Sequence, residues 1–156
     1  MNELAIASEQ KVIVFKLNGN EYALSVEQVT AIEKMNYITR IPKVAAFIKG
    51  VINLRGVIIP IIDLKKRFGL GHTEYTDNTR IIIVSYQDVE VGLIVDSAND
   101  VLDIPVDAIE PQPEVIGAVE AEFISGVAKL EKRLLIMLNL ENILKPISGG
   151  NVTNGD

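Results

Sequence analysis

Residues that could do chemistry are few and widely spaced in this chain. There is one histidine, His72, and no cysteine. A metal site needs several ligands close together, and the polar segment GLGHTEY supplies only one. Ser25, Ser85 and Ser125 lack the GxSxG setting of a catalytic serine. Because no nucleophile, base and oxyanion donor come together, we expect no enzymatic activity.

Two patterns are candidates for a bound metal or cofactor. Four closely spaced aspartates could suggest a cation site: Asp96, Asp100, Asp103 and Asp107. Their spacing lacks the glycine and terminal glutamate of a calcium loop, so we interpret them as turn-forming and solubilising residues. Residues 69–71 form a GxG with no third glycine and no βαβ unit around it, which does not support a dinucleotide site. We therefore expect no metal and no other cofactor.

The elements that would position functional side chains occur twice. Residues 47–64, FIKGVINLRGVIIPIIDL, return at 123–140 as FISGVAKLEKRLLIMLNL. Upstream, residues 11–26 match residues 80–95, and each segment has the pattern of two strands joined by a polar turn. The shared positions are mainly apolar residues and glycines, which fill a core or permit a tight backbone. We infer two structural repeats, at about 11–70 and 80–146.

The repeats are expected to be mainly β, with a few short helices. Short runs rich in Val, Ile and Leu alternate with turns, and helices are expected only near residues 26–29, 64–68 and 139–144. This pattern indicates small antiparallel barrels or a sandwich, and the duplication favours two small barrels side by side. Residues 1–10 are expected to be flexible and residues 147–156 to form a disordered tail.

Glycines and one proline mark places where the backbone is constrained. Gly50 and Gly126 occupy matching positions, which predicts a shared need for positive φ or for close approach of another strand. Gly92 leaves a gap in its strand that a bulge or a neighbouring element must use. Pro60 cannot donate to a β-ladder, so its strand should be an edge or carry a bulge there.

Charge and hydropathy exclude several classes of function. The formal net charge is −6, aromatic residues make up 5% of the chain, and there is no tryptophan. Phosphate neutralisation needs clustered cations and single strands need stacking rings, so a nucleic-acid-binding small barrel is only a distant alternative. The sequence shows neither a signal peptide nor an apolar run long enough for membrane insertion, and we expect a cytoplasmic protein.

One combination of segments resembles a known family. The run GVINLRGVIIPIIDL at 50–64, preceded by PKVAAFIK and followed by KKRFGL, resembles the CheW family of bacterial chemotaxis adaptors. The segments RIIIVSYQDVEVGLIVDSANDVL and PQPEV are also similar, so the likeness covers nearly the whole chain. The resemblance implies two five-stranded SH3-like barrels without an active site. It also implies a monomer when isolated, recruited to membrane receptor arrays, where it couples chemoreceptors to the regulatory domain of the histidine kinase CheA. A same-family adaptor in a non-flagellar sensory array is the alternative.

The same resemblance implies a receptor-binding surface around the groove between the barrels. Its expected residues are Val29, Glu33, Asn53, Arg55 and Gly56. Arg55 is the main candidate, because the resemblance matches it to a receptor-contact position of the family. The second repeat has Glu131 there, so the turn itself does not demand the charge. Many family members have a glutamate at the position of Ala31. Strand alternation would place Glu33 on the same face, where it could substitute.

The resemblance also implies two kinase-binding surfaces, one on each barrel. The first is expected around Ile38, Arg40 and Ile41, and the second around Val115 and Ile116. Exposed aliphatic residues beside prolines can anchor protein contacts. Two opposite surfaces would let adaptor and kinase domains alternate in a ring.

Overall fold

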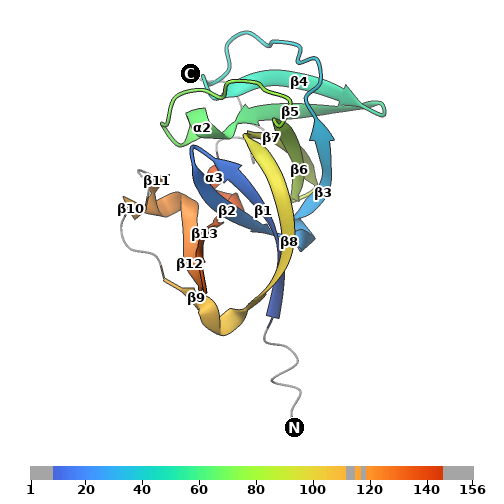
Figure 1. Ribbon diagram of the computed structural model, residues 1–156. Helices are drawn as coiled ribbons and strands as arrows, with labels where there is room; N and C mark the ends of the chain where they lie inside the picture. Colours follow the sequence, from blue (N-terminus) through green and yellow to red (C-terminus); the bar gives the residue numbers. More distant parts are fainter. Residues whose placement is uncertain (1–8, 112–114, 117–118, 146–156) are drawn as a thin grey trace.

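The computed structural model describes residues 9–111, 115–116 and 119–145 (Figure 1). The N-terminal segment and the C-terminal tail that we expected to be flexible lie almost entirely outside these residues. The first strand already begins at Glu9.

The described chain is mainly β, as predicted. Its strands are β1 (Glu9–Leu17), β2 (Asn20–Ser25), β3 (Val29–Lys34), β4 (Ile48–Leu54), β5 (Val57–Asp63), β6 (Arg80–Tyr86), β7 (Val89–Val95), β8 (Ser97–Pro105), β9 (Ile109–Glu110), β10 (Val115–Ile116), β11 (Val119–Glu120), β12 (Ile124–Leu130) and β13 (Arg133–Leu138). The helices are α2 (Leu64–Arg67) and α3 (Leu140–Ile143), with 3₁₀ turns η1 (Val26–Gln28), η2 (Val106–Ala108) and η3 (Ala121–Phe123).

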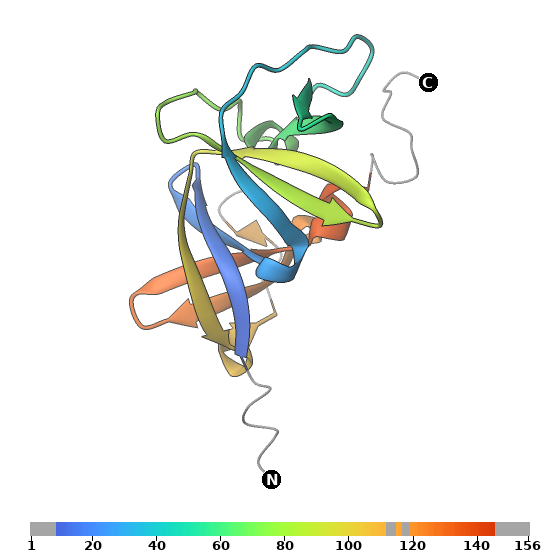
Figure 2. The same cartoon turned by 90° about the vertical axis from the view of Figure 1, so that its right-hand side faces the viewer.

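The strands form two barrel-like sheets that exchange hairpins between the two sequence repeats. The first barrel has the strand order β3-β6-β7-β5-β4, and the second has β8-β1-β2-β13-β12-β9. The β1–β2 hairpin of the first repeat therefore belongs to the second barrel, and the β6–β7 hairpin belongs to the first. Figure 2 shows this exchange, with the blue first hairpin beside the orange strands of the second barrel. The two barrels cannot be separated by cutting the chain between the repeats.

Closure of each barrel explains the matching glycines. In the first barrel Thr39 bridges to Val51, and in the second β9 pairs with β12. A Cβ on Gly50 would overlap the Thr39 carbonyl oxygen, and one on Gly126 would lie 2.9 Å from the Glu110 carbonyl oxygen. The shared requirement is close approach of another backbone segment. Positive φ occurs at Gly50 alone of the two.

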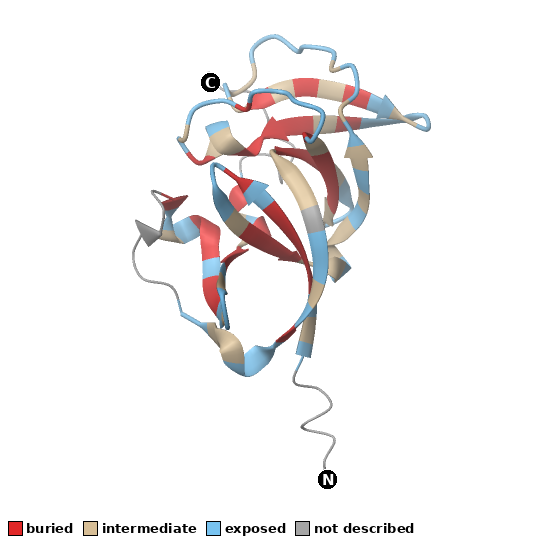
Figure 3. Cartoon of the chain, in the orientation of Figure 1, coloured by how far each residue is buried: buried red, intermediate tan, exposed pale blue. Residues whose placement is uncertain are grey.

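Three apolar clusters hold the fold together. One fills each barrel, and the largest lies between the barrels. Within the first barrel, the gap at Gly92 is used by the side chains of Ile61 and Ile81. Between the barrels, Phe15, Tyr22, Phe68 and Phe123 form a continuous chain of ring contacts with centroid spacings of 5.2 to 6.1 Å. Figure 3 shows the buried residues, in red, along the strands of both barrels.

Arg67 links the repeats directly across this interface. Its guanidinium lies 4.8 Å from the ring centre of Phe47 and 4.6 Å from that of Phe123, the repeat counterpart of Phe47. It also donates hydrogen bonds to the carbonyl oxygens of Ile143 and Asn142 at the end of α3. Burial lowers the pKa of Arg67, and the nearby Glu122 opposes this shift. One cation therefore contacts equivalent aromatic rings from both repeats.

Pro60 limits pairing as predicted. It lies opposite Val51 of β4, and the parallel pairing of β5 with β7 begins only at the next residue, Ile61. In the second barrel the equivalent residue, Ile136, pairs in parallel with Tyr22. Because proline has no N–H to donate, the first half of β5 has a neighbour on one side only.

Strand β8 corrects one sequence-based interpretation. Asp100 and Asp103 were expected in turns, but they lie within a nine-residue strand paired with β1. Polar residues along this strand made it look like a connection, although Ile104 is fully buried. Its carboxylates form ion pairs, with Arg133 at 2.9 Å for Asp100 and with Lys11 at 3.2 Å for Asp103.

Candidate functional site

The expected receptor-binding residues lie mostly at the tip of the β4–β5 hairpin. Arg55 and Gly56 form its two-residue turn, with φ of 54° and 86°. Positive φ at both positions is the type I′ arrangement, whose twist suits a β-hairpin. The side-chain oxygen of Asn53 accepts a hydrogen bond of 2.9 Å from the Gly56 N–H. Asn53 therefore fixes the turn, and the turn presents Arg55 to solvent.

Glu33 on β3 reaches this tip. Its carboxylate lies 3.8 Å from the Arg55 guanidinium, with 26% of the Glu33 side chain and 77% of the Arg55 side chain exposed. Ala31 and Glu33 alternate onto one face, as predicted, since they lie opposite the barrel-interior residues Ile83 and Ile81. At this exposure the ion pair contributes little stability. The Arg55 guanidinium can therefore release the Glu33 carboxylate and bind another one.

Val29 lies apart from the other four predicted residues. It begins β3, whereas Glu33 is near the other end, and its side chain packs against the cluster between the barrels. Sequence reasoning missed two apolar residues at the tip, because Val57 and Ile58 were interpreted only as part of a strand. They are 48% and 59% exposed.

The first predicted kinase surface follows β3. Ile38 is partly buried against the interior of the first barrel, whereas Arg40 and Ile41 are exposed. Val115 and Ile116, expected to form the second surface, form β10, which pairs with β11 in a separate two-stranded sheet. The side chains of these two residues lie outside the described part of the structure.

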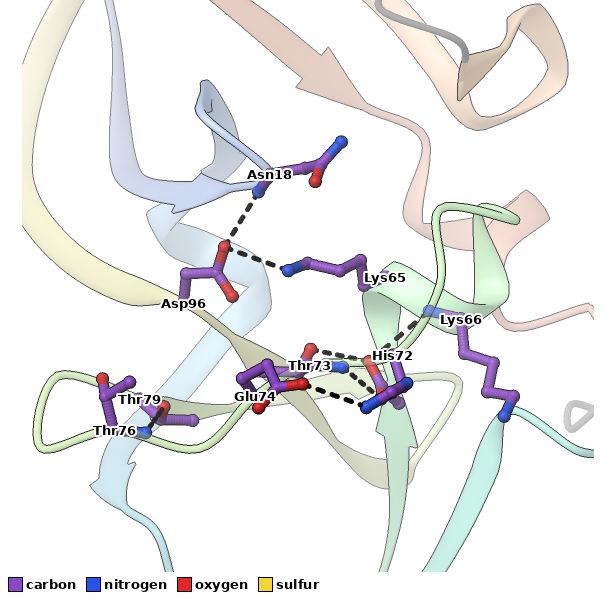
Figure 4. A network of polar contacts seen from close by, with 10 residues as sticks. Asn18, Lys65, Lys66, His72, Thr73, Glu74, Thr76, Thr79 and Asp96 are labelled. Atoms are coloured by element: carbon purple, nitrogen blue, oxygen red, sulfur yellow. Dashed lines mark hydrogen bonds and ion pairs between the residues drawn. The ribbon is translucent and has the colours of Figure 1, made fainter.

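A polar network holds the loop between the repeats (Figure 4). The buried carboxylate of Asp63 accepts hydrogen bonds from the Thr73 N–H at 3.0 Å and the Thr73 hydroxyl at 2.8 Å. It also caps α2 through the Lys66 N–H. Asp96 accepts from the Asn18 N–H and lies 3.6 Å from the Lys65 ammonium. These contacts give the carboxylates a structural role and fix the direction of the α2 side chains.

Across the described residues there is no cluster of three or more His, Asp or Glu side chains suited to a metal ion. His72 is exposed beside Glu74, at 3.4 Å. Nor does any helix in the described ranges have the length and apolar character needed to span a membrane.

Comparison with known proteins agrees with this architecture. The family model of the CheW-like domain matches residues 11–147. The chemotaxis protein CheW of Bacillus subtilis is 49% identical, covering 89% of this chain and 89% of that protein. Its counterpart from Klebsiella aerogenes is 37% identical, covering 86% and 81%. The crystal structure of the scaffolding protein TtCheW from Thermoanaerobacter tengcongensis superposes with a TM-score of 0.81 at 39% identity, covering 92% of this chain and 91% of that one. The chain belongs to the CheW-like domain family.

Proposed function

We propose that this protein is a noncatalytic adaptor that couples chemoreceptor cytoplasmic tips to the histidine kinase CheA. The observation that supports it most is the match of residues 11–147 to the CheW-like domain, together with relatives named as chemotaxis proteins. In this role the protein works from the cytoplasm and is recruited to receptor arrays. It acts through its surfaces, which position two other proteins.

The receptor contact is assigned to the β4–β5 tip. Arg55 occupies a left-handed position that Asn, Asp or Gly would adopt more easily, and such an outlier points to function at the residue concerned. In the second barrel the equivalent turn has Glu131 and Lys132, neither with positive φ. An exposed guanidinium beside Val57 and Ile58 suits a receptor helix that offers a carboxylate and aliphatic side chains.

The kinase contacts are assigned to the two barrels separately. Ile38, Arg40 and Ile41 form the first surface, and the β10 segment with Val115 and Ile116 forms the second. Each surface is small, so moderate affinity is expected for one contact, and the array supplies avidity.

The test separates receptor coupling from kinase binding. Purified protein is mixed with the CheA regulatory domain and, separately, with a receptor cytoplasmic fragment, and both affinities are measured for Arg55→Glu. Loss of a charged hydrogen bond predicts receptor binding weaker by about tenfold or more. Kinase binding should stay unchanged.

Lys132→Glu is the matched control, because Lys132 is an exposed residue of the equivalent hairpin turn. It makes the same change in net charge and should leave both affinities intact. Unchanged receptor binding in Arg55→Glu would remove Arg55 from the contact. Failure of the unmodified protein to bind either partner would sink the proposed function.

A further inference from the structure

A cavity of about 760 Å³ opens on the first barrel between α2, the start of β4 and the segment after β3. Three cationic side chains line it: Arg40, Lys49 and Lys66. The described lining contains no carboxylate. In a chain of net charge −6, this is a local reversal of charge.

These three cations are also without ion-pair partners in the described part of the chain. Elsewhere some basic residues are paired with carboxylates, as Lys11, Lys65 and Lys129 are at 3.2 to 3.6 Å. Figure 4 shows Lys66 directed away from Asp96, which Lys65 contacts instead. Their charges are therefore available to a ligand.

The backbone aims these side chains into the cavity. Lys49 is the extra residue of a β-bulge between Ile48 and Gly50, and a bulge redirects its side chain. Lys66 is fixed by α2, whose cap Asp63 accepts the Lys66 N–H. A strand and a helix thus carry two of the three cations.

The second barrel provides an internal comparison. Its cavity of about 460 Å³ is lined by Ile109, by the bulged Ser125 and by the start of α3. These are the places of Ile38, Lys49 and α2 in the first barrel. Its charged lining residues are Glu27 and Glu141, and its described lining has no Lys or Arg. The second repeat has Ser125 and Asn142 in the places of Lys49 and Lys66, so the fold does not require these two cations.

The rest of the first cavity offers apolar and aromatic contact. Met35 and Ile38 contribute aliphatic surface, while Tyr37 and Tyr75 contribute rings that are at least half exposed. Burial, and then the charge of Asp63, raise the pKa of Tyr75, which keeps its phenol a neutral hydrogen-bond donor. A ligand that suits these walls carries both negative charge and apolar side chains.

We propose that this cavity binds an acidic segment of a partner protein, in which carboxylates contact Arg40, Lys49 and Lys66 and an apolar side chain packs against Met35 and the tyrosines. This inference rests on the proposed function at one point, because Arg40 also belongs to the assigned kinase surface. An acidic kinase segment is the partner that this overlap favours.

The experiment uses the full chain without kinase or receptor. Fluorescence polarisation measures binding of a fluorescein-labelled peptide, Gly-Asp-Glu-Phe-Glu-Glu-Leu-Asp-Gly, and of its counterpart with Asn and Gln in place of Asp and Glu. The test variant is Lys49→Ser with Lys66→Asn, which introduces the residues found at Ser125 and Asn142. We expect the acidic peptide to bind more tightly than the amide peptide, and the double variant to weaken it by about tenfold or more.

The control is Lys16→Ser with Lys132→Asn, which removes two exposed lysines outside the cavity lining. It should bind the acidic peptide as the unmodified protein does. Equal binding of the two peptides, or equal losses in both double variants, would overturn the proposal. Displacement of the peptide by an equal concentration of pyrophosphate would assign the cavity to a small anion and overturn it too. Because kinase is left out, a negative result here with intact kinase binding would leave the proposed function standing.

Discussion

At the scale of single residues, Arg55 is highly exposed and holds a backbone conformation that is unfavourable for arginine. The hairpin places it at φ 54°, and the neighbouring Gly56 has φ 86°. Type I′ turns favour Asn-Gly at these positions because Asn tolerates the left-handed region. The ion pair between Arg55 and Glu33 offsets little of this backbone strain, because it is long and exposed. The turn therefore retains an arginine at a cost in local backbone energy.

Replacement of this arginine should separate stability from function. Arg55→Asn gives the turn its favoured residue pair, so we expect the free energy of unfolding to rise by about 0.5–1 kcal/mol. Receptor binding should fall, as for Arg55→Glu. Urea denaturation followed by circular dichroism measures the first effect. Glu131→Asn is the control, because Glu131 has no positive φ and should give no gain. A less stable Arg55→Asn would contradict the strain argument.

At the scale of elements, local features could be predicted and pairing could not. The turns of the β1–β2 and β6–β7 hairpins, and α3 with its Asn139 cap, follow from residues adjacent in sequence. Strand β8 was missed because its polar residues obscured its alternation. The hairpin exchange between barrels was not predictable, since similar repeats leave open which strands pair. Long-range strand pairing depends on packing between distant segments, which no short stretch of sequence determines.

The same distinction applies to the candidate site. The family resemblance implied Asn53, Arg55 and Gly56, which are nearly consecutive, and strand alternation added Glu33 on the face of Ala31. The cationic cavity was missed because its three cations come from three separated segments. Of the lining residues, only Ile38 and Arg40 had been singled out, both for the kinase contact. The bulge that redirects Lys49 leaves no local signature beyond Gly50.

Barrel closure predicts that replacing Gly50 by alanine costs more stability than replacing the matching Gly126. Gly50→Ala places a methyl group on the Thr39 carbonyl and forces alanine to φ 145°, so we expect a loss of about 3 kcal/mol or more. Gly126→Ala meets the Glu110 oxygen without the φ penalty and should cost about 1–2 kcal/mol. Chemical denaturation of both variants checks the order, with Ser125→Ala as an exposed control. The reverse order would show that these closures do not constrain the glycines.

At the scale of the whole molecule, the largest core lies between the barrels and Arg67 crosses it. Arg67→Ile substitutes the residue of the second repeat, Ile143. It removes two hydrogen bonds and both ring contacts, which predicts a loss of about 2–4 kcal/mol. Because both barrels share this core, unfolding should remain one cooperative transition, measured by calorimetry. Arg67→Lys keeps the charge without the planar fork and should lose an intermediate amount. Two separate transitions would mean that the barrels fold independently.

Hairpin exchange makes the two repeats dependent on each other. In residues 1–77 alone, β1 and β2 would lack their partners β8 and β13, and β3 would lack β6. Their apolar faces would stay in water, so neither this fragment nor residues 78–156 should fold alone, because isolated hairpins are at best marginally stable. Equimolar mixing should restore the paired strands, since the cut lies in an exposed loop. Amide chemical shifts are the measurement: narrow dispersion for each fragment, and the dispersion of the intact chain for the mixture. A single fragment with native dispersion would mean that one repeat closes its own barrel and that the exchange is dispensable.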